Sequence, residues 1–174
     1  MAERETICKK VCDEKIKSID VYQTESLGSI LLVFTERSMK AFRIKIGQKT
    51  QDIEGHTDSI LNIIALEPSR LEQKINEKIP DDPKIITCSL DNTIRLWDSS
   101  DPAKMETMNV LVAPEHSEIS CMTFLVKSCL VATGHEDGSI RLWNLDISSS
   151  VLLKSPKYQH TNSISCIIGV IETP

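Results

Sequence analysis

Two sets of side chains in this sequence combine the groups that hydrolytic enzymes use. Each set holds a histidine, a hydroxyl and an aspartate, namely His56, Ser89 and Asp91 in the first and His116, Thr133 and Asp137 in the second. In a catalytic triad the imidazole activates the hydroxyl and the carboxylate orients the imidazole. Acyl transfer or hydrolysis is therefore the first chemistry to consider.

The repetition of the set speaks against catalysis. Two triads would require two equivalent active sites, whereas a structural element is expected once in each copy of a repeated unit. The sequence also lacks the GxSxG, HExxH, GxxxxGKS, GxGxxG and CxxC patterns of common hydrolase, metal and nucleotide sites. We therefore expect no enzymatic activity, no catalytic residue, no metal ion and no cofactor.

The elements that carry these side chains repeat as well. SLDNTIRLWDSS, at 89–100, returns as HEDGSIRLWNLD, at 135–146. Within TIRLWD and SIRLWN the aliphatic residues alternate with the arginine and the tryptophan, which is the period of a β-strand. A β-rich run and a turn signal precede each copy, and Asn92 or Gly138 supplies the positive φ of a tight turn. Each copy is therefore predicted to be a β-hairpin.

Composition and charge exclude several classes of protein. The net charge is -5, and no basic run exceeds the pair Lys9-Lys10, so a nucleic-acid binder is not expected. The apolar runs are too short to cross a bilayer, and the charged N-terminal stretch lacks the apolar region of a signal peptide. Most of the six cysteines stand in apolar, strand-like runs, where a reduced cysteine packs as a small hydrophobe. We expect an intracellular, cytoplasmic location.

The spacing of the two hairpins resembles that of the WD40 family. The tryptophans are 46 residues apart, close to the repeat of about 40–45 residues in four-stranded propeller blades. WD40 repeats open on Gly-His and close their third strand on Trp-Asp. This chain pairs Gly55-His56 with Trp97-Asp98, and Glu115-His116 with Trp143-Asn144.

The resemblance implies an all-β fold of WD40-type β-propeller blades. It implies three four-stranded antiparallel blades and the first strand of a fourth, which is an incomplete propeller. The predicted units are an N-terminal segment at 1–14, a degenerate blade at 15–54, a blade at 55–112 with an insertion at 67–82, a blade at 113–158 and the start of a further blade at 159–174. Closure would need further blades from a longer parent chain or from a partner; otherwise the units form an open stack.

In the degenerate unit Phe42 takes the tryptophan position, Glu36 the aspartate position and Leu32 the threonine position.

Three other features of the sequence each allow two interpretations. The segment at 1–14 is either a helical turn or disordered. The insertion is a solvated loop or a short docking helix, since its apolar residues recur every four positions. Arg95 and Arg141 are strand-face residues between blades or part of an anion-binding ring.

WD40 blades contain a hydrogen-bonded chain of His, Ser or Thr, Asp and Trp. The resemblance places these structural tetrads on His56, Thr87, Asp91 and Trp97, and on His116, Thr133, Asp137 and Trp143. The residue types suit this role, because an indole N–H only donates, a hydroxyl passes a hydrogen bond on, and an imidazole both accepts and donates. Removing one member would leave its neighbours buried and unpaired, at a cost of about 1–3 kcal/mol.

The resemblance also implies a function. It implies a non-catalytic protein–protein interaction scaffold built from WD40 repeats, acting as a subunit or fragment of a larger intracellular complex. Partner-binding loops are expected on one face, at Asp58, Asn92, Glu115, Glu118, Glu136 and Asn162. Because that face is rich in Asp, Glu and His, we expect it to prefer basic segments of other proteins.

Two further interpretations remain open at this stage. The alternative function is a substrate-recognition subunit of a ubiquitin ligase, although no adaptor-binding motif is visible in 1–14. The degenerate repeats and the long polar insertion are similar to large multi-repeat WD40 proteins of cytoskeletal or ciliary assemblies. That likeness adds a cytoskeletal or ciliary location to the cytoplasmic expectation.

Overall fold

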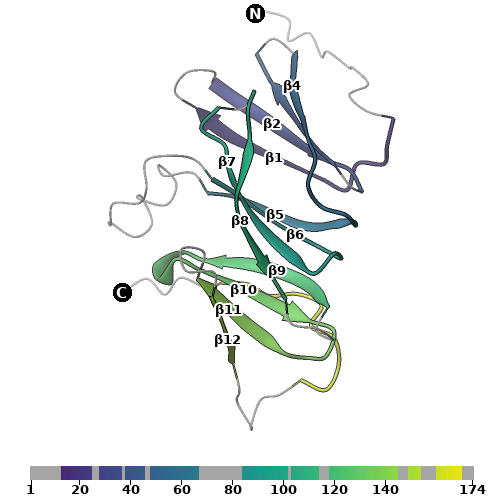
Figure 1. Ribbon diagram of the computed structural model, residues 1–174, viewed down its shortest axis with the longest axis vertical. Helices are drawn as coiled ribbons and strands as arrows, with labels where there is room; N and C mark the ends of the chain where they lie inside the picture. The colour runs from purple at the N-terminus through teal and green to yellow at the C-terminus, as the bar shows by residue number, and fades with distance from the viewer. Residues whose placement is uncertain are drawn as a thin grey trace, which may run out of the picture.

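The described residues of the protein form three β-sheets that follow one another along its long axis (Figure 1). The computed structural model describes residues 13–24, 28–36, 38–45, 48–66, 84–101, 103–113, 118–144, 149–153 and 160–169. Within these ranges the chain forms twelve strands and one 3-10 turn at Val126–Ser128. Each sheet has four antiparallel strands, so the predicted all-β fold of four-stranded blades in an incomplete propeller is confirmed.

Each sheet is a meander in which strands adjacent in sequence are paired. Blade 1 contains β1 (Ser18–Thr24), β2 (Gly28–Phe34), β3 (Met39–Arg43) and β4 (Gln48–Ile53). Blade 2 contains β5 (Ile60–Leu66), β6 (Lys84–Ser89), β7 (Thr93–Asp98) and β8 (Glu106–Val112). Blade 3 contains β9 (Ile119–Leu125), β10 (Leu130–His135), β11 (Ile140–Asn144) and β12 (Ser149–Leu153). The first strands of successive blades contact one another.

The two tryptophan hairpins form as predicted. β6 pairs with β7 and β10 pairs with β11, and in each hairpin the buried threonine lies opposite the arginine. The turns contain Asn92, with a φ of 60°, and Gly138, with a φ of 79°. Glycine reaches this left-handed region without strain, and asparagine tolerates it better than most residues. The turn residues therefore allow each chain reversal.

Two apolar cores lie between the blades. The first joins blades 1 and 2 and contains Tyr22, Ile30, Leu32, Phe34, Met39, Ala41, Ile53, Ile85, Trp97 and Met105. The second joins blades 2 and 3 and contains Ile86, Cys88, Ile94, Leu96, Leu111, Ala113, Ile119, Met122, Val131 and Trp143. Because side chains alternate along a strand, Ile85 and Ile86 enter different cores. Each blade therefore depends on its neighbours to bury its faces.

The same kind of hydrogen bond marks each blade junction. An isoleucine at the start of the incoming segment donates its backbone N–H to the turn of the preceding blade. The N–H of Ile60 lies 2.9 Å from the carbonyl oxygen of Glu36, and the N–H of Ile119 lies 3.3 Å from the side-chain oxygen of Asn92. After blade 3, the N–H of Ile164 lies 3.0 Å from the carbonyl oxygen of His135. The segment at 160–169 therefore starts on blade 3 as β5 and β9 start on the blades before them.

This last segment differs from the sequence prediction. The first strand of a further blade was expected within 159–174, but the described residues 163–169 form no strand. The physical reason is that a strand exists only within a ladder of main-chain hydrogen bonds, and no described residue supplies a ladder to this segment.

Several predictions concern other parts of the chain. Residues 1–12, the insertion at 67–82 and the segment at 154–159 lie outside the described residues, so the predictions made for them stay predictions. In the described part, no helix is long and apolar enough to cross a membrane.

Candidate functional site

A chain of hydrogen bonds runs through the interior of blade 2. The indole N–H of Trp97 donates to Oγ1 of Thr87 over 2.9 Å, and this hydroxyl lies 2.6 Å from Nε2 of His56. The other ring nitrogen of His56, Nδ1, lies 2.9 Å from Oδ2 of Asp91. The structure thus brings together the four side chains that the sequence analysis assigned to the first tetrad. Each provides the donor or acceptor that its neighbour needs.

Asp91 ends this chain in a site that favours its charged form. Its Oδ1 accepts hydrogen bonds from the N–H and the hydroxyl of Thr93, and its Oδ2 accepts from the N–H of Thr57 and from His56. Burial alone would raise the pKa of Asp91, but these hydrogen bonds outweigh burial and lower the pKa to about 2. The carboxylate is therefore ionised at neutral pH.

His56 is neutral in the same environment. Burial lowers the pKa of His56 below its ordinary value, and the attraction of Asp91 offsets only part of that effect. The partners assign the proton to Nδ1, which donates to Asp91, and leave Nε2 to accept from the Thr87 hydroxyl. The contact of His56 with Asp91 is therefore a charge-assisted hydrogen bond from a neutral ring.

Glycine is required just before this histidine. A β-carbon on Gly55 would lie 2.7 Å from Cη2 of Trp97 and 3.0 Å from Nη1 of Arg95. Both distances are shorter than a normal contact, so a side chain at position 55 would displace the tryptophan or the arginine. The Gly-His pair therefore lets the connection approach the indole closely.

The geometry of blade 2 does not suit a catalytic triad. The hydroxyl that meets His56 belongs to Thr87, which is 0% exposed and already accepts the indole N–H. The Ser89 hydroxyl donates to the carbonyl oxygen of Asp58 over 2.9 Å. A nucleophile must reach its substrate, and the Thr87 hydroxyl is closed to solvent. Among the described residues no group of three His, Cys, Asp or Glu side chains could hold a metal ion.

Blade 3 has the same tryptophan bond with a different continuation. The indole N–H of Trp143 donates to Oγ1 of Thr133 over 2.7 Å. That hydroxyl lies 2.8 Å from Nε2 of His135, which stands two residues further along β10 and is fully buried. The sequence analysis did not assign His135 to the second tetrad, so the structure adds this histidine to the site. His116, predicted for the second tetrad, lies outside the described residues.

Asp137, the aspartate of the second tetrad, is exposed at the turn of blade 3. Its Oδ1 accepts the N–H of Ser139 over 2.9 Å. Burial alone would raise the pKa of Asp137, but the hydrogen bonds from Ser139 and the charges of His135 and Arg141 together lower it. The carboxylate is therefore ionised, but it stands in water.

Blade 1 replaces the polar chain with apolar side chains. Phe42 pairs with Leu31, as Trp97 pairs with Ile85, so the expected equivalence of Phe42 to the tryptophan fits the register. The threonine position falls on Val33, not on Leu32 as predicted. The reason is that only four residues separate the last paired residues of β2 and β3, Phe34 and Met39, whereas five separate Cys88 and Ile94 in β6 and β7.

Turns and connections from all three blades share one face of the molecule. The hydrogen bonds that join them run between the backbones of Leu90 and Ser59, Ala113 and Asn92, Ile60 and Glu36, and Glu136 and Glu118. At the end of blade 3, a β-carbon on Gly138 would lie 2.3 Å from the carbonyl oxygen of His160. The connection at 160–162 therefore lies directly on the turn at 135–139. We call this surface the turn face.

The turn face is rich in exposed carboxylates. Of the predicted partner-binding residues, Asp58, Glu118, Glu136 and Asn162 are exposed, Asn92 is half-buried, and Glu115 lies outside the described residues. Sequence reasoning assigned Glu36 to a motif position and missed it as a surface residue, yet its side chain is 57% exposed. Glu54 and Asp137 are also exposed here, and Lys17 lies 3.8 Å from Glu36. The described part of this face thus carries a clear excess of negative charge.

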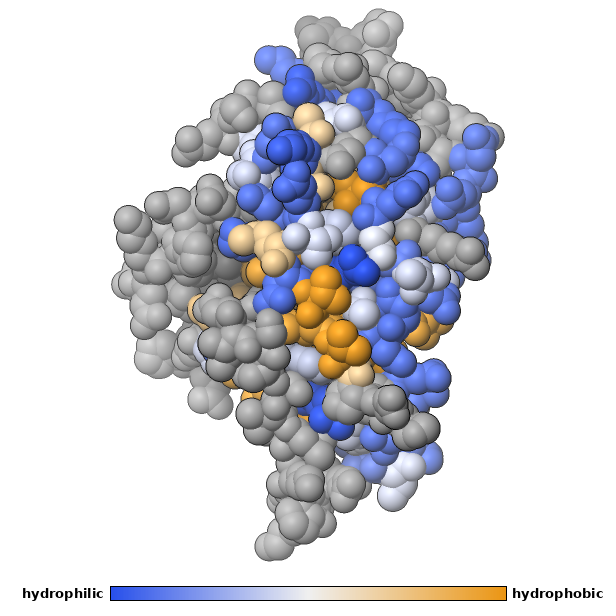
Figure 2. Space-filling view, viewed as in Figure 1, coloured by the Kyte–Doolittle hydropathy of each residue, from blue (hydrophilic) through white to orange (hydrophobic). Residues whose placement is uncertain are grey.

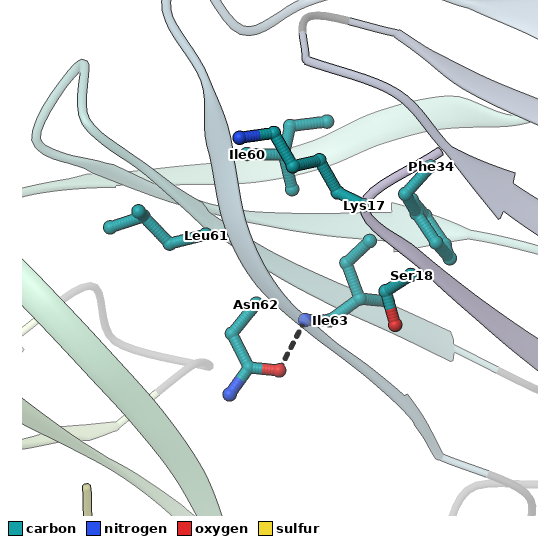
Figure 3. A pocket seen from close by; sticks show the side chains of 7 residues that line it. All are labelled: Lys17, Ser18, Phe34, Ile60, Leu61, Asn62 and Ile63. Carbon is teal, nitrogen blue, oxygen red and sulfur yellow. Dashed lines mark hydrogen bonds between the residues drawn. The ribbon is translucent and has the colours of Figure 1, made fainter. Parts of the chain in front are cut away.

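A cavity of about 220 Å³ opens where blades 1 and 2 meet. Figure 3 shows the seven residues that line it: Lys17, Ser18, Phe34, Ile60, Leu61, Asn62 and Ile63. The amide of Asn62 is fixed, because its Oδ1 accepts the N–H of Ile63 and its Nδ2 donates to the carbonyl oxygen of Met122. The cavity lining therefore combines the polar residues Lys17, Ser18 and Asn62 with apolar side chains, and Lys17 pairs with Glu36.

A second surface is apolar. Figure 2 shows apolar side chains gathered over β8, where alternate residues Met108, Val110 and Val112 are exposed.

The two arginines of the repeated strings lie on the third strands of their blades, Arg95 on β7 and Arg141 on β11. Their Nε atoms are buried without a hydrogen-bond partner among the described residues. An anion-binding role for these arginines stays a prediction.

Comparison with known proteins identifies the repeated unit. A family model described as "WD domain, G-beta repeat" matches residues 47–98 and 107–144, which together make up just over half of the chain. Each match begins on the outer strand of one blade, β4 or β8, and ends on the third strand of the next, β7 or β11. One sequence repeat therefore contains the last strand of one blade and the first three strands of the next, so that it connects two blades. A search of the curated proteins found no match.

Proposed function

Because the chain belongs to the WD40 repeat family, we propose that it is an interaction scaffold whose acidic turn face captures basic segments of other proteins. WD40 domains in general are non-catalytic platforms for protein–protein interaction. The observation that carries the proposal is the excess of exposed carboxylates on the turns and connections of all three blades. Opposite charge steers a partner toward such a face and fixes its register.

The rigid interior of the blades supports this role. The buried chain in blade 2 joins the connection at 54–59, strand β6, the turn at 89–92 and strand β7. A satisfied polar network holds these segments in one arrangement. The carboxylates at the surface are thus presented from a fixed frame, which lowers the entropy lost when a partner binds.

We extend the proposal to membership of a larger intracellular complex. The four cysteines in the described residues are free, and two of them are buried, which suits a reducing compartment. Affinity capture from cell extract, followed by mass spectrometry, tests the assembly. Recovery of ubiquitin-ligase adaptors would instead support the substrate-recognition role, whereas recovery of cytoskeletal or ciliary proteins would support the structural assemblies that the repeats resemble.

The charge preference can be tested directly on the purified chain. The probe is a fluorescent nonapeptide rich in Lys and Arg, and its affinity is measured by anisotropy at low and physiological salt. The triple variant Asp58→Lys, Glu118→Lys, Glu136→Lys should bind it about tenfold more weakly, since each exposed pair contributes a few tenths of a kcal/mol or more.

The matched control is Glu106→Lys, which reverses an exposed carboxylate on β8 that pairs with Lys104 at 3.3 Å. This variant should bind the peptide like the native chain, because Glu106 lies at the end of β8 opposite the turn face. Equal loss in both variants would mean that only net charge matters, and the turn face would then have no special role.

A further inference from the structure

Arg95 on β7 carries a half-buried positive charge. Its side chain lies on the face of blade 2 that packs on blade 1, as does Trp97 two residues further along the strand. The guanidinium lies beside Gly55, where a β-carbon would stand 3.0 Å from Nη1 of the arginine. A charge that is partly removed from water costs free energy unless it is paired. The position of Arg95 therefore favours a negatively charged partner.

Such a partner is missing from the part of the chain that the structure describes. Within that part, the Arg95 guanidinium makes neither a hydrogen bond nor an ion pair, and its Nε atom is buried. Glu54 is exposed and directly precedes Gly55, yet it makes no ion pair with Arg95 among the described residues. The charge of Arg95 is thus unbalanced within the described blades.

The matching cation of blade 1 does have a partner. Lys40 lies opposite Val33, which stands at the threonine position of that blade. Arg95 lies opposite Thr87 in the same way, so the two cations take the same place in their blades. The ammonium of Lys40 lies 3.5 Å from the carboxylate of Glu14, which precedes β1. Blade 1 therefore fills from its own chain an acidic position that is open in blade 2.

The residue before the histidine differs between the two blades that carry an arginine. In blade 2 it is Gly55, whose backbone lies against Arg95. In blade 3 Arg141 lies opposite Thr133 in the same register, but the sequence has Glu115 before its histidine. Glu115 lies outside the described residues. Of these two blades, blade 2 is the one whose sequence supplies no side chain at this position.

The surface beside Arg95 is apolar. Val110 lies directly opposite Arg95, so the two side chains share one face of the sheet. Met108 and Val112 stand two positions away on either side along β8, and all three apolar residues are exposed (Figure 2). Alternate residues of an extended chain lie about 6–7 Å apart on one side. An extended segment along β8 would thus place one side chain at Arg95 and its alternate neighbours over Met108 and Val112.

From these observations we infer that Arg95 and the exposed apolar residues of β8 dock an extended segment of a partner protein, in which an aliphatic residue stands two positions away on each side of a Glu or Asp. The carboxylate takes at Arg95 the place that Glu14 takes at Lys40, and arginine binds carboxylates through two parallel hydrogen bonds. The aliphatic side chains cover Met108 and Val112. This surface selects an acidic segment, whereas the turn face selects a basic one, so the inference does not depend on the proposed function.

Three synthetic peptides test the inference on the full chain. The first probe is acetyl-Thr-Ile-Thr-Glu-Thr-Ile-Thr-amide, the second has Gln in place of Glu, and the third has Ser in place of both Ile residues. NMR titration of the Val110 and Val112 methyl groups measures the affinities. We expect the first peptide to bind about tenfold more tightly than the second, because the second cannot form a charged pair with Arg95. The third should also bind more weakly than the first, because it buries less apolar surface.

Equal affinity of the first two peptides would overturn the role of the carboxylate. Equal affinity of the first and the third would overturn the role of the apolar residues of β8.

The variant Arg95→Met removes the charge and keeps a long side chain. It should bind the first two peptides equally, and its urea midpoint should stay close to that of the native chain, because no described group loses a partner. Lys40→Met, the same change at the matching position of blade 1, is the control and should keep the peptide preference. A preference that survives in Arg95→Met would contradict the inference.

A second variant supplies the carboxylate from the chain itself, as Glu14 does in blade 1. Val112 is 67% exposed, so the fold tolerates Val112→Glu. The new carboxylate should lower the affinity for the first peptide about tenfold and change that for the second much less. Equal effects on both peptides would show that charge at Arg95 does not select the segment.

The chain itself contains another acidic segment, the insertion with Glu67, Glu72 and Glu77. Changing all three residues to Gln tests it as the occupant. If the native chain binds none of the peptides and this variant binds the first, the surface is occupied by the insertion, and a partner protein is ruled out.

The turn-face variant Asp58→Lys, Glu118→Lys, Glu136→Lys separates the inference from the proposed function. It should bind the first peptide like the native chain, because its substitutions lie on the turn face and not on β8. Loss of the first peptide in this variant would place the binding on the turn face and overturn the inference. Failure of the Lys- and Arg-rich nonapeptide to distinguish this variant would leave the inference about β8 standing.

Discussion

Blades 2 and 3 carry the same tryptophan hairpin but complete it with different histidines. In both blades the indole N–H donates to a buried threonine hydroxyl. In blade 2 that hydroxyl meets His56, which comes from the connection before the blade and reaches on to Asp91. In blade 3 it meets His135, which stands on the same strand as Thr133.

The difference shows which parts of the motif follow from strand pairing. The Trp–Thr bond depends only on the register of two adjacent strands, so both hairpins form it. The two aspartates differ in their exposure to solvent. Asp91 has a side chain that is 6% exposed beneath His56, whereas Asp137 is exposed at its turn.

The largest effect should come from the tryptophans. Trp97→Ala should lower the free energy of unfolding by about 3–5 kcal/mol, because the indole fills the core between blades 1 and 2. Urea denaturation followed by circular dichroism measures the loss. Trp143→Ala should cost a similar amount in the core between blades 2 and 3. A loss below about 1 kcal/mol at either site would mean that its core does not join two blades.

Removal of the threonine hydroxyl should also affect both blades alike. Thr87→Val and Thr133→Val keep the shape of the side chain but leave an indole N–H and an imidazole nitrogen without their partner. Each substitution should lower the free energy of unfolding by about 1–3 kcal/mol, as measured by urea denaturation. Thr107→Val, at an exposed position of β8, is the control and should change stability by less than about 0.5 kcal/mol. If only one blade responded, the two Trp–Thr bonds would not be equivalent.

The aspartates should separate the two blades. Asp91→Asn weakens four hydrogen bonds to a buried carboxylate. It should lower the free energy of unfolding by about 1–3 kcal/mol. Asp137→Asn should cost less, because its exposed carboxylate is solvated and its interactions are screened. Urea midpoints of the two variants, measured side by side, make the comparison. Equal losses would show that the second aspartate is as deeply involved as the first.

Acid should weaken blade 2 in a predictable order. The pKa of His56 is lowered on folding, so its contribution to stability is complete above about pH 6.5 and is lost as the pH falls below that value. The pKa of Asp91 falls from 3.8 to about 2, so its contribution is present above about pH 4 and is lost as the pH falls toward 2.

Denaturation series at several pH values measure this order in the native chain and in Asp91→Asn. The variant should lack the lower step of the pH dependence while retaining part of the upper one. A variant with an unchanged profile below about pH 4 would show that other carboxylates govern acid stability.

Much of the fold could be predicted from local pattern. Alternation in TIRLWD and SIRLWN, with Asn92 or Gly138 at the turn, was sufficient to predict both hairpins because strand period and turn chemistry are local properties. The Thr–Trp spacing of ten residues places the two side chains beside each other once the turn length is known.

The remainder depended on packing that a single sequence does not display. The position of Leu32 was wrong by one residue, because a shorter turn shifts the register and sequence spacing alone cannot show it. The contact of His135 with Thr133 had a visible signal, since residues i and i+2 of a strand share one face. That signal was overlooked because the histidine of the second tetrad was assigned to His116.

The joint between blades has a consequence for how such proteins change over generations. Ile60, Ile119 and Ile164 each fasten to the previous unit through a main-chain N–H, a group that every amino acid except proline supplies. Most mutations of these three isoleucines therefore leave the N–H donor in place, whereas the acceptor for Ile119 is a side chain that a mutation of Asn92 would remove. Gene duplication can thus lengthen or shorten the array while reusing this contact. A proline at position 60, 119 or 164 would remove the N–H and with it the hydrogen bond between the blades.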